Sequence, residues 1–191
     1  MLPVLRAISV VNSAILGIGR QIAWMALGLM VVVILLQVVF RYVFNNALAW
    51  PDEAARFLML WMTGFIAPSA YRWGGFVSIE MLPQLLPRFL ENILIISLLV
   101  LSLIILLIGF QLGLQHINIG WIFNSSSLKI PLDLIGSEQK PIKLAWMYMS
   151  LPVGIFLLIL VNIELILKKL ILTFNSEINL PKDKNKEYLG V

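Results

Sequence analysis

The chain has 191 residues, of which 60% are hydrophobic and 13% are charged, and its formal net charge is +4. Soluble domains carry about 25% charged residues, so this composition indicates an all-α integral membrane protein with little chain left for a soluble domain. The absence of cysteine excludes disulfides, thiolate metal sites and cysteine nucleophiles. Because the basic residues lie scattered at predicted helix ends, we expect no nucleic-acid partner.

The first predicted element is an amphipathic helix over residues 4–20. Its polar residues fall near one helical stripe, and its apolar residues lie elsewhere, which is typical of a helix lying in the membrane interface. Arg6 and the apolar run after it also resemble a signal peptide, but no cleavage motif follows and Arg20 interrupts the run. An uncleaved surface helix is therefore the better interpretation. The polar stripe consists of Arg6, Ser9, Asn12, Ser13 and Arg20.

Four apolar stretches are long enough to cross a membrane, because about 20 helical residues span a bilayer core of about 30 Å. At the end of the first stretch Arg41 can extend its guanidinium to the lipid headgroups. Asn45 and Asn46 then form a short turn, so the first two spans make a helical hairpin. Glycine and alanine recur in the second span, which favours close helix packing there. The predicted spans are residues 22–43, 53–72, 92–115 and 144–167. The packing residues are Gly64, Ala67, Ala70 and Gly74.

The connections complete a single membrane domain over residues 1–174. Residues 76–90 predict a second interfacial helix, with a plain loop as the alternative because prolines weaken helix interiors. Residues 116–143 predict an irregular connection. Glu164 and Lys168 are spaced to pair within the fourth span. Residues 175–191 form a polar tail, which we expect to be disordered.

The distribution of Lys and Arg predicts the orientation of the chain. More of them lie on the side of the N-terminus and of the tail than on the opposite side. Basic residues are enriched in cytoplasmic segments, so both termini are predicted to be cytoplasmic.

Catalytic motifs are missing from the sequence. The pattern HExxH is absent, as are GxSxG and the phosphate-binding loop, and His116 is the only histidine. The predicted spans hold small or weakly polar residues instead of the ionisable groups that mark a solute path. We therefore expect no enzyme activity, no cofactor or metal site, and no substrate site in this chain.

The densest polar feature is the start of the second span, WPDEAAR. Pro51 suits a first helical turn, and Asp52 and Glu53 complement the positive end of the helix dipole. Arg56 lies within reach of both acids, so the three charges can form one cluster. An arginine one turn inside the membrane needs a partner, in this chain, in a subunit or in a lipid. The candidate contact residues are Arg41, Trp50, Asp52, Glu53, Arg56, Trp61 and Arg72.

The segment FRYVFNNALAWPDEAARFLMLWMTGFIAPSAYRWGGFVSIEML resembles the small, DctQ-like membrane subunit of tripartite ATP-independent periplasmic (TRAP) transporters. Phe76 stands near a position where that family often has histidine. The fourth span also resembles a family signature through Tyr148, Pro152 and Gly154. The matching positions of the segment are Arg41, Tyr42, Asn45, Trp50, Asp52, Glu53, Ala55, Arg56, Trp61, Arg72, Gly74 and Glu80.

This resemblance implies a three-component importer in the bacterial inner membrane. A periplasmic substrate-binding protein delivers an organic acid, and a large membrane subunit moves it by a sodium-coupled elevator motion. The small subunit is implied to be a multi-pass scaffold that supports the large subunit and contacts membrane lipids. Substrate and sodium sites are then expected in the large subunit.

Two alternatives belong to other classes. One is a membrane-anchor subunit of a quinone- or haem-linked oxidoreductase, although a single histidine cannot supply two haem ligands. The other is a solute channel built from several copies of the chain. Neither explains the motif between Arg41 and Arg56.

Overall fold

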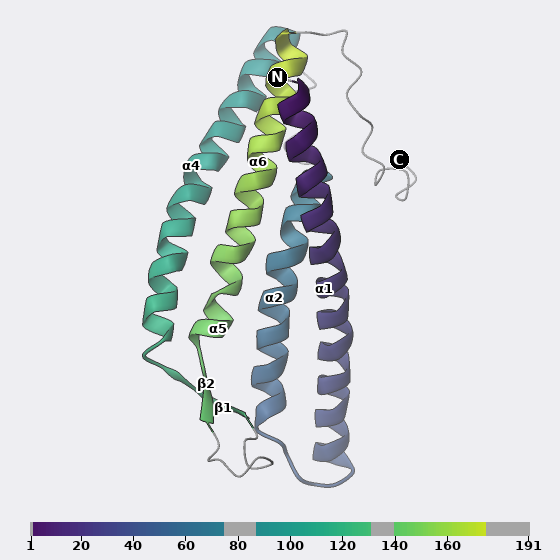
Figure 1. Cartoon of the computed structure of the whole chain (residues 1–191). Helices are drawn as coiled ribbons and strands as arrows, with labels where there is room; N and C mark the ends of the chain where they lie inside the picture. Colours follow the sequence, from purple (N-terminus) through teal and green to yellow (C-terminus); the bar gives the residue numbers. More distant parts are fainter. Residues whose placement is uncertain (1, 75–86, 131–139, 175–191) are drawn as a thin grey trace.

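The computed structural model describes residues 2–74, 87–130 and 140–174 of the chain. These residues form long helices that run up and down in a bundle, with a strand pair at one end (Figure 1). We call that end the strand end, and the opposite end, where α1 begins and α6 stops, the terminal end. The elements are α1 (Leu2–Tyr42), α2 (Trp50–Arg72), α4 (Arg88–Gly120), β1 (Asn124–Ile130), β2 (Lys140–Lys143), α5 (Ala145–Tyr148) and α6 (Ser150–Phe174).

Two helices form the middle of the bundle. α2 packs against both α1 and α6, and α4 packs against α6. α1 and α4 therefore lie on opposite flanks, each with a broad side turned away from the other helices (Figure 1).

Three of the described helices are long and apolar enough to cross a membrane, within Leu5–Tyr42, Phe89–Gly120 and Ala145–Thr173. They coincide with three of the predicted spans, which confirms a helical, multi-pass membrane protein. α2 is not among these three. It ends at Arg72, the predicted boundary, but its first turn holds Asp52 and Glu53 and its last turn holds Arg72. A fourth span therefore stays a prediction.

Helix α1 differs from the expectation of a separate surface helix. Residues 4–20 are helical, but they continue without a break into the first span, giving one helix of 41 residues. At 1.5 Å per residue its length is about 60 Å, about twice a bilayer core. Leu5 and Leu16 are buried, and Gly19 lies against Phe65 of α2. This part of α1 packs onto the bundle, because its polar stripe finds partners there.

Close backbone contact joins α2 to α6. A Cβ atom added to Gly64 would lie 2.8 Å from the carbonyl oxygen of Ser150, and one added to Gly154 would lie 2.9 Å from the Cα of Gly64. Only glycine fits at both positions, which confirms the predicted packing role of Gly64. Ala70, in contrast, is exposed, and Gly74 adopts a positive φ of 78° just after α2 ends.

The connection after α4 is more regular than predicted. β1 and β2 pair antiparallel, with Asn124 opposite Lys143 and Ile130 opposite Lys140. A short helix, α5, follows, and Met149 separates it from α6. Most of the helix predicted over residues 76–90 lies outside the described residues, although residues 88–90 belong to α4. The predicted tail over residues 175–191 also lies outside the described residues.

Candidate functional site

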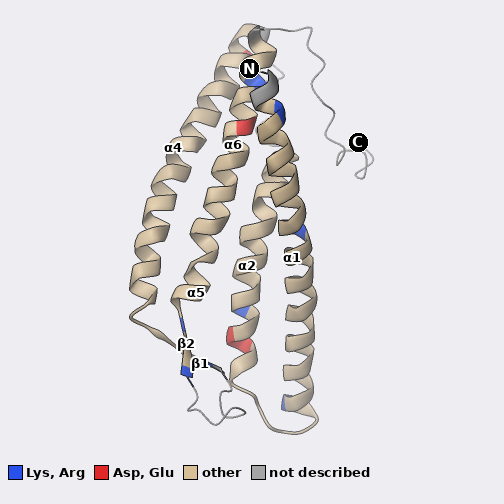
Figure 2. Cartoon of the chain, in the orientation of Figure 1, with Lys and Arg blue, Asp and Glu red and all other residues tan. Residues whose placement is uncertain are grey.

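Polar side chains gather at two places in the described part of the chain. Figure 2 shows basic residues toward both ends of the bundle, and acidic residues in α2 near the strand end and in α6 near the terminal end. We call the group in the bundle near the terminal end the core cluster and the group beside β1 the strand cluster. The core cluster consists of Ser9, Asn12, Ser13, Arg72, Glu164 and Lys168, and the strand cluster of Glu53, Ser126, Ser127 and Leu128.

The core cluster centres on a buried ion pair between α2 and α6. Arg72 Nη2 lies 2.9 Å from Glu164 Oε1, and the two side chains are only 2% and 0% exposed. Lys168 Nζ lies 3.0 Å from the same oxygen, which confirms the predicted pairing of Glu164 with Lys168. A single carboxylate therefore neutralises part of two positive charges.

Helix α1 completes this cluster with the polar stripe of the sequence. Asn12 Nδ2 donates hydrogen bonds to Glu164 Oε2 at 2.8 Å and to the carbonyl oxygen of Leu160 at 3.1 Å. Ser13 Oγ accepts from Arg72 Nη1 at 2.8 Å, and Ser9 Oγ accepts from Arg72 Nη2 at 3.0 Å. The stripe thus faces the bundle, because its hydroxyl and amide groups bind the charges that α2 and α6 bury.

Two further contacts fasten the same helices. Arg20 of α1 lies over the ring of Trp73, with the guanidinium carbon 4.9 Å from the ring centroid. Asn162 Nδ2 of α6 donates to the hydroxyl of Tyr71 at 2.7 Å. Together with the core cluster, they join α1, α2 and α6 through residues that are far apart in the sequence.

This cluster was not predicted from the sequence, because Arg72 was interpreted as a contact residue and Glu164 only as a partner of Lys168. A usable signal was present. Ser9 lies one helical turn before Asn12 and Ser13, so the three residues can present hydroxyl and amide groups together. A polar triplet on one helix and opposite charges on two others suggest a shared interior site.

The strand cluster forms around a carboxylate at the start of α2. Glu53 Oε2 accepts hydrogen bonds from the backbone N–H of Ser127 at 2.9 Å and of Leu128 at 3.3 Å. The hydroxyl of Ser127 donates to the same oxygen, and that of Ser126 lies 3.5 Å from it. Glu53 therefore anchors β1 to α2.

The predicted cluster of three charges does not form in the described part of the chain. Glu53 turns to β1, Asp52 and Arg56 are exposed, and Arg56 makes no ion pair with any described residue. The reason is energetic, since an exposed ion pair contributes at most about 1 kcal/mol. Several donors on one carboxylate contribute more. Asp52, Glu53 and Arg56 do line one cleft of about 310 Å³, together with Ser126 and Tyr148.

The other predicted contact residues are spread over the molecule. Arg41 is exposed at the end of α1, where its guanidinium carbon lies 5.8 Å from the ring centroid of Tyr42. Trp50 is 38% exposed at the start of α2. Trp61 donates from Nε1 to the carbonyl oxygen of Trp146 at 3.2 Å, tying α2 to α5. The structure places Asp52, Glu53 and Arg56 along one cleft without an ion pair among them, and it places Arg72 in the core cluster at the other end.

These clusters offer contacts between elements rather than reactive groups. Within the described residues, no group of three or more His, Asp or Glu side chains could hold a metal ion. Glu164 is bonded on both oxygens, and Arg72 on both terminal nitrogens. The arrangement suits a rigid membrane component.

Comparison with known proteins identifies the protein family of this chain. The chain matches, over residues 30–171, the family described as "Tripartite ATP-independent periplasmic transporters, DctQ component". It is also similar to a protein of Haemophilus influenzae whose name describes it as a TRAP transporter small permease, with 35% identity over 68 residues. That match covers 36% of this chain and 42% of the relative, so the chain spans less than half of the curated relative in the match. The chain therefore belongs to the DctQ component family of tripartite ATP-independent periplasmic transporters, and is a transporter component and not an enzyme.

Proposed function

We propose that this chain is the scaffold subunit of a sodium-coupled TRAP transporter. In this proposal it holds a large membrane subunit that carries an organic acid, delivered by a periplasmic binding protein, across the inner membrane. The chain itself binds neither substrate nor sodium and needs no cofactor. Family membership supports its place in such a transporter.

One observation carries the scaffold role. The charged and amide groups of the core cluster are bonded to one another across α1, α2 and α6. Groups that bind a moving solute must exchange partners during transport, whereas these groups stabilise one fixed packing of the helices. A bundle fastened in this way is suited to stay still while a neighbouring subunit moves.

We further propose that α2 is a fourth span and that both termini are cytoplasmic. α2 packs between α1 and α6 along the bundle, so it shares their environment although it is less apolar. With the terminal end in the cytoplasm, Lys168 and Lys169 lie near the cytoplasmic leaflet, as the distribution of basic residues favours. The strand cluster then faces the periplasm.

The test is purification of this chain, with an affinity tag, from native membranes in mild detergent. We expect a much larger multi-span protein to accompany it in near-equal amounts, because a scaffold without its partner exposes its docking surface. The purified complex should retain ²²Na⁺, and the separated small subunit should not. Recovery of this chain alone, stable and able to transport, would contradict the proposal.

A variant at Arg56 probes the periplasmic end. We expect Arg56→Ala to lower the yield of the complex or the transport rate without changing which organic acid is carried, because Arg56 has no ion-pair partner among the described residues. Lys140→Ala is the control, since Lys140 is also an exposed basic residue of the strand end but lies outside the cleft. An Arg56→Ala complex with normal yield and altered specificity would contradict the scaffold role.

A further inference from the structure

Helix α4 carries a stripe of exposed residues along the whole of its length. The members recur alternately every four and every three residues, which is the spacing that keeps side chains on one face against a second helix. We call this face the outward stripe. Its members are Ile93, Ser97, Val100, Ile104, Leu107, Gln111, Leu114 and Asn118, all of them exposed in the structure.

The outward stripe lies opposite the contact with α6. Gly109 and Gly113 face α6, where added Cβ atoms would meet Ile155 and Pro152 at 3.5 and 3.3 Å. At about 100° of rotation per residue, Gln111 lies about 160° around the helix from each of these glycines. The stripe is therefore directed away from the bundle.

Amide groups make this face unsuited to lipid. Gln111 and Asn118 are exposed, and in the described part of the chain their side chains form no hydrogen bond. Gln111 lies about 15 Å along the axis from Trp121, a residue type that favours the membrane interface. Gln111 lies inside the predicted span 92–115, about 6 Å from its end, where acyl chains offer no hydrogen-bond partner, whereas Asn118 lies just beyond that span.

The opposite flank of the bundle provides a contrast. Along residues 22–40 of α1, no exposed position carries an amide, a hydroxyl or a charge. Gln37, the one amide residue in that range, is half-buried. A purely apolar face is adequately covered by lipid. The amide groups therefore distinguish the outward stripe from the exposed face of α1.

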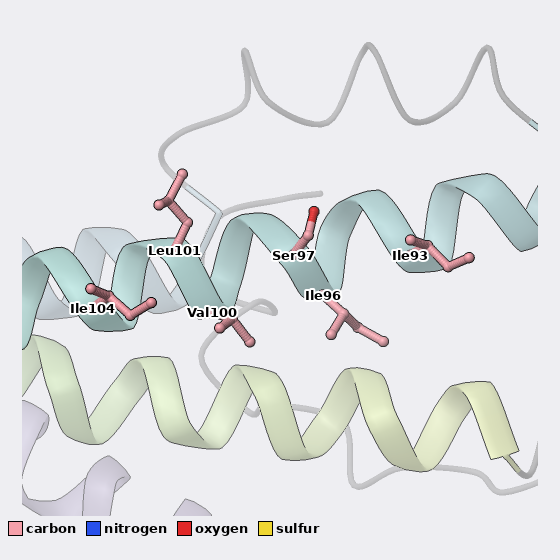
Figure 3. Close-up of a pocket in the computed structure, with 6 residues that line it drawn as sticks. All are labelled: Ile93, Ile96, Ser97, Val100, Leu101 and Ile104. Atoms are coloured by element: carbon pink, nitrogen blue, oxygen red, sulfur yellow. The ribbon is translucent and has the colours of Figure 1, made fainter.

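The shape of the stripe also suits a helix. The half of the outward stripe nearer the terminal end of the bundle borders an open apolar groove of about 490 Å³. Figure 3 shows the lining residues along successive turns of α4, with Ser97 between Ile93 and Leu101. Small residues such as serine permit close approach between membrane helices, where no hydrophobic force drives association.

We propose that the outward stripe of α4 is the surface on which a membrane-spanning helix of the large transporter subunit docks. The aliphatic residues pack against that helix, and Gln111 and Asn118 bind polar atoms on it and fix its register. The proposal rests on the proposed function, since its occupant is the large subunit. It adds which face of this chain makes the contact.

Photocrosslinking in native membranes tests the surface. Benzoylphenylalanine would replace Ile104 or Leu107 on the stripe and, as controls, Val32 or Leu35 on the exposed face of α1. We expect illumination to join the α4 variants to the large subunit and to leave the α1 variants unjoined. Crosslinking from α1 alone, dimers of this chain alone, or no crosslinked protein while the large subunit still co-purifies would each overturn the proposal. Failure of the unsubstituted chain to recover the large subunit would instead contradict the proposed function.

A second variant measures the contribution of the amide. Gln111→Leu keeps α4 apolar and helical, so the subunit still folds, but it removes the hydrogen bond to the partner. We expect the large subunit to dissociate at least about three-fold more readily, because such bonds contribute about 0.6–2 kcal/mol in membranes. Leu112→Ala, one residue off the stripe, is the control. Equal retention of the large subunit by Gln111→Leu and by the unsubstituted chain would contradict the role of the amide.

Discussion

At the scale of single residues, Glu164 is the most heavily bonded side chain of the core cluster. Both of its oxygens are engaged, and it is completely buried. The residues that bind it come from three helices. Removing one partner of a buried ion pair leaves an uncompensated charge and costs about 3–5 kcal/mol, whereas removing both partners costs less.

The first prediction follows for this pair. We expect Glu164→Gln to lower the free energy of unfolding of the detergent-solubilised subunit by about 3 kcal/mol, because Arg72 then loses its buried counter-charge. The double variant with Arg72→Met and Glu164→Gln should be more stable than Glu164→Gln alone. Equilibrium unfolding of the four members of this cycle checks both expectations. Additive losses would show that the ion pair does not stabilise the bundle.

The second prediction concerns Glu53. We expect Glu53→Gln to weaken the attachment of β1 by about 1–3 kcal/mol, because a neutral amide oxygen is a weaker acceptor than the carboxylate oxygen on which the donors of β1 converge. Hydrogen exchange at the amides of Ser127 and Leu128 should become about tenfold faster or more. Asp52→Asn is the control, since Asp52 is the exposed neighbour. Equal exchange in both variants would contradict the role assigned to Glu53.

At the scale of elements, the contact between α2 and α6 depends on two glycines. We expect Gly64→Ala or Gly154→Ala to destabilise the subunit by about 1–3 kcal/mol, because the new Cβ would lie within 3 Å of backbone atoms of the facing helix. Gly28→Ala is the matched control. No atom lies within 4 Å of its added Cβ, so it should be neutral or stabilise α1 by up to about 1 kcal/mol. Thermal unfolding of the three variants measures the difference, and equal melting temperatures would contradict it.

The sequence predicted most of these elements because hydropathy reports which residues avoid water. The end of α2 at Arg72 and the spans within α4 and α6 follow directly from apolar runs bounded by polar residues. Hydropathy does not show which neighbouring element a polar stripe faces. Ser9, Asn12 and Ser13 fit a surface helix as well as a helix facing Arg72, so the continuous helix α1 was missed. The strand pair was missed because its support, Glu53, lies far away in the sequence.

At the scale of the whole molecule, the proposed topology can be tested with single cysteines, because the chain has none of its own. We expect a membrane-impermeant maleimide added outside spheroplasts to label Asn46→Cys and Ile122→Cys. Phe89→Cys and Thr173→Cys should react only after the membrane is opened. All four residues are exposed, so differences in labelling report the side of the membrane. Labelling of both Asn46→Cys and Phe89→Cys from outside would show that α2 does not cross.

The central claim is that this chain supports transport without carrying the solute. Its most direct test is uptake into vesicles with and without an inward-directed sodium gradient. The binding protein is added outside, and the probe is the organic acid that stabilises that protein in a thermal-shift panel. The account predicts sodium-driven uptake only when this chain and the large subunit are both present, with none by this chain alone. Uptake by vesicles that contain this chain without the large subunit would contradict it.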